Sequence, residues 1–329
     1  MKSLTPSDKS RIKKILVVSL SNLGDVILTF PVIDILLQDF PGVPLSVVVG
    51  PKGKELFQSN PLIERVYVFE KKSSALEKMR WVNNLKKERF DLVVDLRNTA
   101  IPLFVNAKFR TTYRDGVDKN LHKLQKHLKR LRSVWHFIEE RRNRRAIYIT
   151  GRDKSCVDAL LKEGRLLNRP FVMVAPGAAN HIKRWREEGF AAIADELITR
   201  HVNVVFVGDR NDKPVVLSII NRMRNPAFDA TGKTTMLQLA ELIHRSLLVI
   251  ANDSAVMHLA SYLDKPTIAI FGPTDESKYG PWSSRSRVVR KKLFCTPCEK
   301  SGCAYHHECM NELAVADVWE AIRSGFLNL

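Results

Sequence analysis

Two short segments, one near each end of the chain, carry side chains that can do chemistry. Ser21–Asp25 places a carboxylate just after an apolar run, and Asn252–His258 places Asp253, Ser254 and His258 just after another. Both lie where a buried strand passes into a helix, which is where open α/β sheets bind ligands. The free N–H groups at a helix start suit a phosphate, and a carboxylate can accept a proton. The sequence therefore predicts two half-sites of a substrate pocket, in a cleft between two similar domains.

The elements that must position these segments alternate along the chain. In the first half, apolar runs predict strands at residues 15–20, 45–49, 65–69 and 92–96, with helices over 26–40 and 74–89. The second half repeats the pattern, with strands at 171–175, 202–207, 247–251 and 267–271, and helices at 185–200, 214–224, 235–244 and 254–263. Strands that alternate with helices in this way predict an α/β protein with parallel sheets.

The length and composition indicate two globular domains. A chain of 329 residues is too long for one ordinary doubly wound domain. We expect domains at residues 1–155 and 170–329, with a short helix and a linker over 151–169. No apolar run approaches the ~20 residues of a membrane span. Residues 1–14 lack the apolar core of a signal peptide, so we expect the protein in the cytoplasm.

One basic segment interrupts the alternation. Between residues 119 and 145, apolar residues recur at spacings of three and four, which predicts one face of a single helix. They are Leu121, Leu124, Leu128, Leu131, Trp135 and Ile138. We expect the leucine face to pack on its domain and the basic face, with Lys123, Lys126 and Arg130, to contact phosphates or carboxylates. The net charge of +18 likewise indicates an anionic partner, which can be a nucleic acid, a membrane face or an acidic substrate.

Four of the five cysteines lie within fifteen residues, in the pattern C-x2-C-x4-C-x5-C formed by Cys295, Cys298, Cys303 and Cys309. Four thiolates so spaced can bind one structural metal ion in a tetrahedral site. The second pair lacks the tight spacing of a zinc knuckle. The alternative, a set of reduced cysteines in a loop without metal, stays open.

The chain resembles glycosyltransferase family 9, the bacterial lipopolysaccharide heptosyltransferases. Four segments carry the resemblance in order: LVVSLSNLGDVILTFPVIDIL, APGAANHIKRW, VVFVGD and VIANDSAVMHLASYLDKPTIAIFGPTD. The resemblance implies a GT-B fold, in which two Rossmann-like domains with parallel sheets face each other across a cleft. It implies an N-terminal domain that binds the acceptor and a C-terminal domain that binds a nucleotide-sugar.

The resemblance also implies roles for individual residues. Asp25 matches the general base that deprotonates the acceptor hydroxyl; the alternative interpretation is an acid that complements a helix dipole. Lys183 matches a lysine on the donor phosphates, whereas its neighbours Arg184 and Arg186 are expected to be surface charges. The other matched donor positions are Gly24, Asp253, Ser254, Ala255 and His258.

Three departures concern the donor. Ala255 stands where relatives often have Gly, and Ala178 and Ala179 stand where some carry hydroxyls. An acid expected after Gly208 for the ribose has an unclear register among residues 209–212.

The implied reaction is metal-independent, inverting transfer of a heptose from ADP-heptose to the lipid A–core acceptor of lipopolysaccharide. No cofactor is required for it, and it takes place at the anionic inner face of the cytoplasmic membrane. Within the family, a protein side chain is the alternative acceptor.

A different class, a non-enzymatic binder of nucleic acid or another anionic surface, is disfavoured because the basic segment lacks interleaved aromatic residues. A dinucleotide-dependent oxidoreductase is disfavoured because residues 19–24 are not G-x-G-x-x-G.

Overall fold

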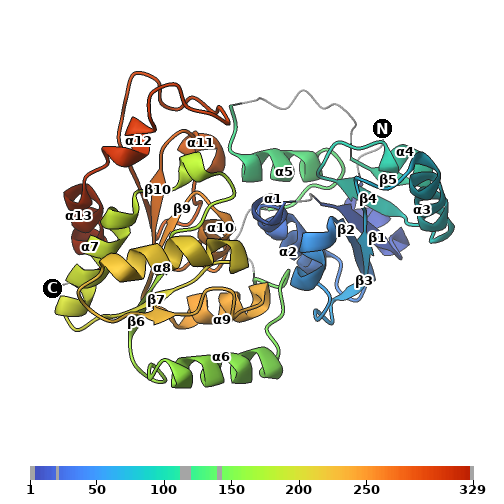
Figure 1. Ribbon diagram of the computed structural model, residues 1–329. Helices are drawn as coiled ribbons and strands as arrows, with labels where there is room; N and C mark the ends of the chain where they lie inside the picture. Colours follow the sequence, from blue (N-terminus) through green and yellow to red (C-terminus); the bar gives the residue numbers. More distant parts are fainter. Residues whose placement is uncertain (1–3, 20–21, 112–119, 139–142, 327–329) are drawn as a thin grey trace. The chain divides into compact units, whose positions relative to one another are not determined.

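The computed structural model describes residues 4–19, 22–111, 120–138 and 143–326. Ser21 and the basic residues Lys119, Arg141 and Arg142 lie outside the described residues. The chain forms two compact units, Met1–Tyr148 and Ile149–Leu329, each built around its own sheet (Figure 1). Among the described helices, none is long and apolar enough to cross a membrane.

The first unit contains a five-stranded sheet in the order β3-β2-β1-β4-β5. The strands are β1 (Ile15–Val18), β2 (Leu45–Val49), β3 (Ile63–Val68), β4 (Leu92–Asp95) and β5 (Phe109–Arg110), and neighbouring strands run parallel. Every residue of β1, β2 and β4 is buried, as expected for parallel strands covered on both faces. The parallel sheet predicted from the apolar runs is therefore confirmed.

Helices and short 3-10 turns connect these strands. They are η1 (Pro6–Arg11), α1 (Leu23–Ile27), α2 (Phe30–Asp39), η2 (Pro51–Leu56), α3 (Ala75–Lys87), α4 (Ile101–Val105) and α5 (Lys123–Arg132). The single helix predicted over 26–40 is wrong, because α1 and α2 are separate. Between them the Thr29 hydroxyl donates to the carbonyl of Val26 (2.6 Å), and Pro31 stands in the first turn of α2, where its missing N–H is tolerated.

The prediction of one basic helix from 119 to 145 is also wrong. Helix α5 ends at Arg132, and the Ser133 hydroxyl donates to the carbonyl of Arg130 (2.7 Å). Beyond it, the chain pairs with Leu4 through an isolated bridge at Trp135, whose indole N–H donates to Asp39 (2.8 Å). The regular spacing of apolar residues therefore continues past Arg132, although the backbone is no longer helical there. Of the predicted face, Leu124, Leu128, Leu131 and Trp135 are buried, whereas Ile138 is 70% exposed.

The second unit contains a six-stranded sheet in the order β11-β10-β9-β6-β7-β8. The strands are β6 (Phe171–Ala175), β7 (Asn203–Phe206), β8 (Phe228–Asp229), β9 (Leu248–Asn252), β10 (Thr267–Phe271) and β11 (Ser286–Arg290), and again neighbours run parallel. The three central strands β6, β9 and β10 are buried along their whole length.

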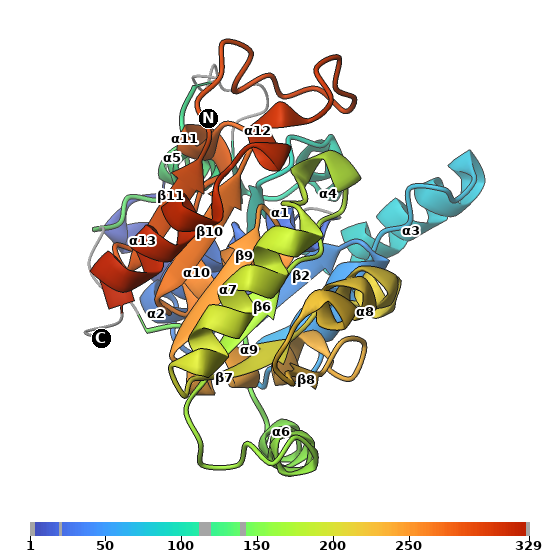
Figure 2. The same ribbon diagram turned by 60° about the vertical axis from the view of Figure 1, so that its left-hand side comes forward.

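The helices of the second unit pack in two groups. Helix α7 (Glu187–Thr199) contacts α8 (Lys213–Arg222) and α13 (Val315–Phe326), whereas α9 (Met236–Arg245) contacts α10 (Ala255–Tyr262) and α6 (Gly151–Glu163) (Figure 2). The shorter elements are η3 (His181–Lys183), η4 (Arg210–Asp212), α11 (Glu276–Tyr279) and α12 (Glu308–Asn311). Helix α6 belongs to this unit, and Asp158 on it accepts a hydrogen bond from Arg245 of α9.

Both sheets have one point at which the strand order reverses. In the first unit the chain moves from β1 to β2 and β3, then returns to β4 on the other side of β1. In the second unit it moves from β6 to β7 and β8, then returns to β9 on the other side of β6. Ligands of open parallel sheets bind outside the carboxyl ends of the strands at such a reversal. Each unit therefore has one position where a ligand is expected.

Candidate functional site

The reversal point of the first unit holds Asp25. The residue lies on α1, directly after β1, and its carboxylate accepts a hydrogen bond from the side-chain amide of Asn22 (3.4 Å). Lys123 Nζ lies 4.0 Å from Asp25 Oδ1, and the two side chains are 30% and 29% exposed. The structure therefore brings together two residues that were predicted for different roles. The Asp25 carboxylate is accessible, and a cation lies beside it.

A second acid, Asp95, lies at the same reversal and was missed in the sequence. It ends β4 in register with Val18 of β1, and it is buried. Its carboxylate accepts hydrogen bonds from the backbone N–H groups of Arg97 and Thr99 and from the Thr99 hydroxyl. Burial raises the pKa of Asp95 above its ordinary value, and these hydrogen bonds and the charge of Arg130 offset only part of that effect. Asp95 could have been found in the sequence as an acid that ends an apolar run, since ligands bind at the carboxyl ends of parallel strands.

Helix α5 supplies the basic residues around this point. Lys123 begins the helix and lies beside Asp25. The charge of Arg130 affects the ionisation of Asp95. Lys126, which lies between these two residues in the sequence, is half-buried. His127, on the packed face, is 2% exposed and neither ring nitrogen has a hydrogen-bond partner. Burial lowers the pKa of His127 to about 3, so this ring is neutral and belongs to the packing of α5.

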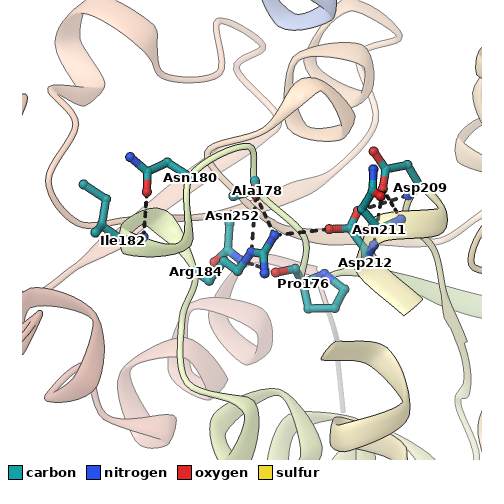
Figure 3. Close-up of polar contacts among 9 residues, drawn as sticks. All are labelled: Pro176, Ala178, Asn180, Ile182, Arg184, Asp209, Asn211, Asp212 and Asn252. Atoms are coloured by element: carbon teal, nitrogen blue, oxygen red, sulfur yellow. Dashed lines mark hydrogen bonds and ion pairs between the residues drawn. The ribbon is translucent and has the colours of Figure 1, made fainter. Parts of the chain in front are cut away.

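The reversal point of the second unit is organised by Asn252, the last residue of β9. Its side-chain amide donates to the carbonyl of Pro176 (2.7 Å), and its side-chain oxygen accepts from the backbone N–H of Trp185 (3.1 Å). Asn252 therefore ties the end of β9 to both ends of the loop that follows β6 (Figure 3 shows its bond to Pro176).

This loop carries Lys183, whose Nζ lies 2.7 Å from Asp253 Oδ2. The two side chains come from segments seventy residues apart, and they are 32% and 8% exposed. The lysine neutralises a carboxylate that is otherwise buried. Since an ammonium group also pairs with phosphate oxygens, a bound diphosphate could share or replace this contact.

Helix α10 begins beside the ion pair, with Ser254 as its N-cap and Ala255 as its first residue. The Ser254 hydroxyl is buried and has no hydrogen-bond partner, and the N-cap makes no side-chain cap bond. The unsatisfied N–H groups of a helix start and its dipole favour an anion at this end.

His258 lies one turn further along α10. Its ring is 5% exposed and stacks on Trp282, with ring centroids 6.1 Å apart. Gly24, the remaining donor position from the sequence, lies in the first unit next to Asp25.

Arg184 is not a free surface charge, contrary to the expectation. Its guanidinium donates to the carbonyl of Ala178 (3.0 and 3.3 Å) and lies 3.6 Å from Asp212 Oδ1 (Figure 3). Burial raises the pKa of Asp212. A Cβ at Gly177 would lie 2.3 Å from the Asp212 carboxylate, so any larger residue there would have to displace that side chain. Arg184 therefore clamps the loop after β6 to the loop after β7. In the second loop, exposed Asp209 caps η4 and half-buried Asp212 points toward the clamp.

The four clustered cysteines line one cavity of about 390 Å³, together with Ile182 and Pro273. The Cys303 sulfur accepts hydrogen bonds from the backbone N–H groups of Tyr305 (3.3 Å) and His307 (3.4 Å). In the part of the chain that the structure describes, no three histidine, cysteine, aspartate or glutamate side chains are grouped so that they could hold a metal ion. The four thiols thus share one cavity.

The cysteine loop also braces the loop that carries Lys183. The side-chain amide of Asn180 donates to the carbonyl of Ser301 (3.2 Å), and the rings of His181 and His307 lie 5.4 Å apart. His181 begins η3, and Lys183 ends it, so the cysteine loop contacts the short helix that carries Lys183.

Comparisons with known proteins show which family the chain matches and which fold it shares. The sequence profile of glycosyltransferase family 9 (heptosyltransferase) matches residues 79–308. The chain is 25% identical over 310 residues to lipooligosaccharide heptosyltransferase 2 of Campylobacter jejuni subsp. jejuni serotype O:6, an alignment that covers 92% of this chain and 95% of that protein.

Two solved structures share the fold. The glycosyl transferase family 9 protein of Veillonella parvula DSM 2008 has a TM-score of 0.82 at 23% identity, covering 96% of this chain and 98% of that one. The E. coli ADP-heptose lipopolysaccharide heptosyltransferase II has a TM-score of 0.76 at 21% identity, covering 95% and 98%. The predicted GT-B fold, with two Rossmann-like units and parallel sheets, is confirmed.

Proposed function

The chain belongs to glycosyltransferase family 9, and from this premise we propose that it transfers a heptose from ADP-heptose to the inner core of lipopolysaccharide. Proteins similar to it are named lipooligosaccharide heptosyltransferase 2 and ADP-heptose lipopolysaccharide heptosyltransferase II. The observation that carries the proposal is the placement of reactive groups: each parallel sheet has an ionic pair at its own reversal point.

The second unit provides the donor half of the proposed reaction. Lys183 and the start of α10 supply positive charge where a diphosphate accumulates negative charge as it leaves. The unpartnered Ser254 hydroxyl offers one more hydrogen bond to a phosphate or ribose oxygen. In this proposal the basic groups and the helix dipole manage the leaving group, so that transfer requires neither cofactor nor metal ion.

The first unit provides the acceptor half. Asp25 is the proposed general base, which removes the proton of the acceptor hydroxyl as that oxygen attacks the anomeric carbon. A single displacement inverts the anomeric configuration. Lys123 forms an ion pair with it, and Lys123, Lys126 and Arg130 of α5 would contact an acceptor rich in phosphates and acidic sugars.

The net charge of +18 suits an acceptor of this kind at the anionic inner face of the cytoplasmic membrane. In this proposal nucleic acid is not a partner.

The test is a thermal-stabilisation screen of nucleotide-sugars, followed by a transfer assay. A donor at a hundred times its dissociation constant stabilises the native state by about 2.7 kcal/mol, which raises Tm by several degrees. We expect ADP-heptose to stabilise more than ADP-glucose, UDP-glucose or GDP-mannose, and to be consumed only when a lipopolysaccharide core acceptor is added. Stabilisation by a uridine or guanosine donor alone would contradict the proposed donor. Transfer to a protein in place of the core would contradict the proposed acceptor.

A further inference from the structure

Two helices of the first unit expose large apolar side chains to solvent. Leu76 and Met79 on α3 are 51% and 59% exposed, and Leu103 and Phe104 on α4 are 48% and 59% exposed. Helices α3 and α4 contact each other and lie side by side (Figure 1). We call these four residues the apolar rim. Scattered single apolar residues are normal on a protein surface, but four on two contacting helices call for an explanation.

The apolar rim lies at the same edge of the sheet as Asp25. Helix α3 connects the parallel strands β3 and β4, so its first turn lies near the carboxyl end of β3. Trp81, in the middle of α3, packs on Phe69, the residue after β3, with ring centroids 5.1 Å apart. Leu76 and Met79 precede Trp81 and therefore lie beyond the end of the strand.

Helix α4 reaches the same edge from β4. The strand ends at Asp95, and α4 begins at Ile101, after the turn that the Asp95 carboxylate holds. Since Asp95 pairs in register with the end of β1, which leads to Asp25, Leu103 and Phe104 are on the acceptor edge of the sheet.

The surroundings of the apolar rim are basic. Lys71, Lys72, Lys78 and Arg80 lie just before α3 or in its first half, where Leu76 and Met79 also lie. The acid among them, Glu77, caps the start of α3 through Ser74. The cations on this surface therefore meet little compensating charge.

We propose that the apolar rim and the basic residues of α3 dock the first unit on an anionic lipid bilayer. Apolar side chains that enter the interface, beside lysines that meet anionic headgroups, are the features that hold a peripheral protein on a membrane. A protein partner fits less well, because lysine is depleted in protein–protein interfaces. The inference rests on the proposed function for its purpose, which is to place the acceptor edge against the bilayer that holds the lipid acceptor.

This surface differs from the one first expected. Helix α5 has no exposed large apolar side chain. Its Lys123 pairs with Asp25, and the charge of its Arg130 acts on Asp95. The cations of α5 therefore serve the acceptor itself, whereas α3 and α4 serve the membrane.

Vesicle sedimentation tests the proposal on the full chain. We expect binding to vesicles of phosphatidylethanolamine and phosphatidylglycerol (3:1), and little binding to phosphatidylcholine. Changing the four rim residues together (Leu76→Ser, Met79→Ser, Leu103→Ser, Phe104→Ser) should weaken anionic-vesicle binding at least tenfold. The matched control is Leu217→Ser with Leu247→Ser, since these leucines of the second unit are comparably exposed, at 44% and 46%. The control should bind like the parent, and both variants should keep the parent Tm.

Two further measurements separate this proposal from the proposed function. With a deacylated, water-soluble core acceptor, kcat/KM of the rim variant should match the parent, whereas with acceptor embedded in vesicles it should fall. If the chain transferred no heptose at all, vesicle binding would still decide the docking proposal. Equal vesicle binding by parent and rim variant would overturn it. So would a parent that is dimeric by light scattering and becomes monomeric in the rim variant with vesicle binding unchanged, because the rim would then join two copies.

Discussion

At the scale of single residues, the reactive groups were visible in the sequence, but their partners were not. Asp25 was proposed because it follows an apolar strand and matches the family base, and Lys183 was proposed because its segment resembles glycosyltransferase family 9. The pairs Asp25–Lys123 and Lys183–Asp253 join residues far apart in the chain, so no local spacing reveals them. Asp95 was missed because it ends a strand without a neighbouring motif, and only the strand order places it beside β1.

The general-base assignment makes the first residue-scale prediction. Asp25→Asn keeps the size of the side chain and removes its ability to take a proton, so the rate of heptosyl transfer should fall ~10²–10⁴-fold. The affinity for ADP-heptose, measured by calorimetric titration, should change little. Asp91→Asn serves as a control, because Asp91 binds the backbone N–H groups of Lys13 and Lys14 away from the reversal point. Activity of Asp25→Asn within a few-fold of the parent would rule out this base.

The ion pair of the second unit makes the second prediction. Lys183→Ala removes the positive charge at the proposed diphosphate site, and Asp253→Ala removes the group that positions it. Both variants should bind ADP-heptose at least tenfold more weakly, since a hydrogen bond to a charged group contributes about 1.5–3 kcal/mol. Lys213→Ala is the matched control, because Lys213 pairs with Asp229 elsewhere in the same unit. Parent-like affinity in both test variants would remove the donor site from this position.

At the scale of elements, strands were predicted better than helices. A strand buried on both faces is a continuous apolar run, and such runs correspond to β1, β2, β4, β6, β9 and β10. Helix ends depend on contacts that periodicity does not contain. The apolar spacing after Arg132 predicted more helix, whereas pairing of Trp135 with Leu4 holds that part of the chain in another conformation. The ion pair between Arg184 and Asp212 likewise forms only where two loops meet in the fold. Sequence spacing does not show that meeting, so Arg184 was predicted to be a surface charge.

The cysteine loop gives the element-scale prediction. Burial and the neighbouring cysteines raise the pKa of Cys309 to about 11, so only ~10⁻³ of it is thiolate at pH 8. Iodoacetamide should therefore modify Cys309 much more slowly than Cys156, which is exposed on α6. Mass spectrometry of the peptides over time measures the order, and the unfolded chain, in which all thiols are accessible, is the control.

The same experiment distinguishes the two interpretations of the loop. Without a metal, Cys303 is exposed and should react early. If a metal ion were held, Cys295, Cys298 and Cys303 would all be protected and a chelator would release them together. Cys309 reacting as fast as Cys156 would contradict the buried, neutral thiol.

At the scale of the whole molecule, the sequence predicted the class of fold because length, alternation and buried runs are global properties. Two α/β units with parallel sheets followed from these alone. The boundary between the two units was harder to predict from the sequence. Helix α6 packs on α9, which lies about 90 residues further along the chain, and local patterns do not show such a contact. Charge behaves similarly: the sum of +18 indicates an anionic partner, but only the structure separates cations near Asp25 from those near the apolar rim.

Because the cations of α5 and α3 lie at different places on the first unit, we predict that neutralising each helix changes the acceptor KM differently. Neutralising α5 with Lys123→Gln, Lys126→Gln and Arg130→Gln should raise the acceptor KM severalfold for both soluble and vesicle-embedded acceptor. Neutralising the start of α3 with Lys71→Gln, Lys72→Gln and Arg80→Gln should raise it only for the embedded acceptor, because those residues are exposed and lie near the apolar rim.

Both effects should shrink as salt is added, since the Debye length is about 10 Å at 0.1 M. Donor affinity should stay constant in each variant, because the proposed donor contacts Lys183 and Asp253 belong to the second unit. If the α5 variant instead lost donor binding and kept its acceptor kinetics, the acceptor role of the first unit would be wrong. If the α3 variant impaired turnover of the soluble acceptor as strongly as the α5 variant, the cations of the two helices would not have separate roles.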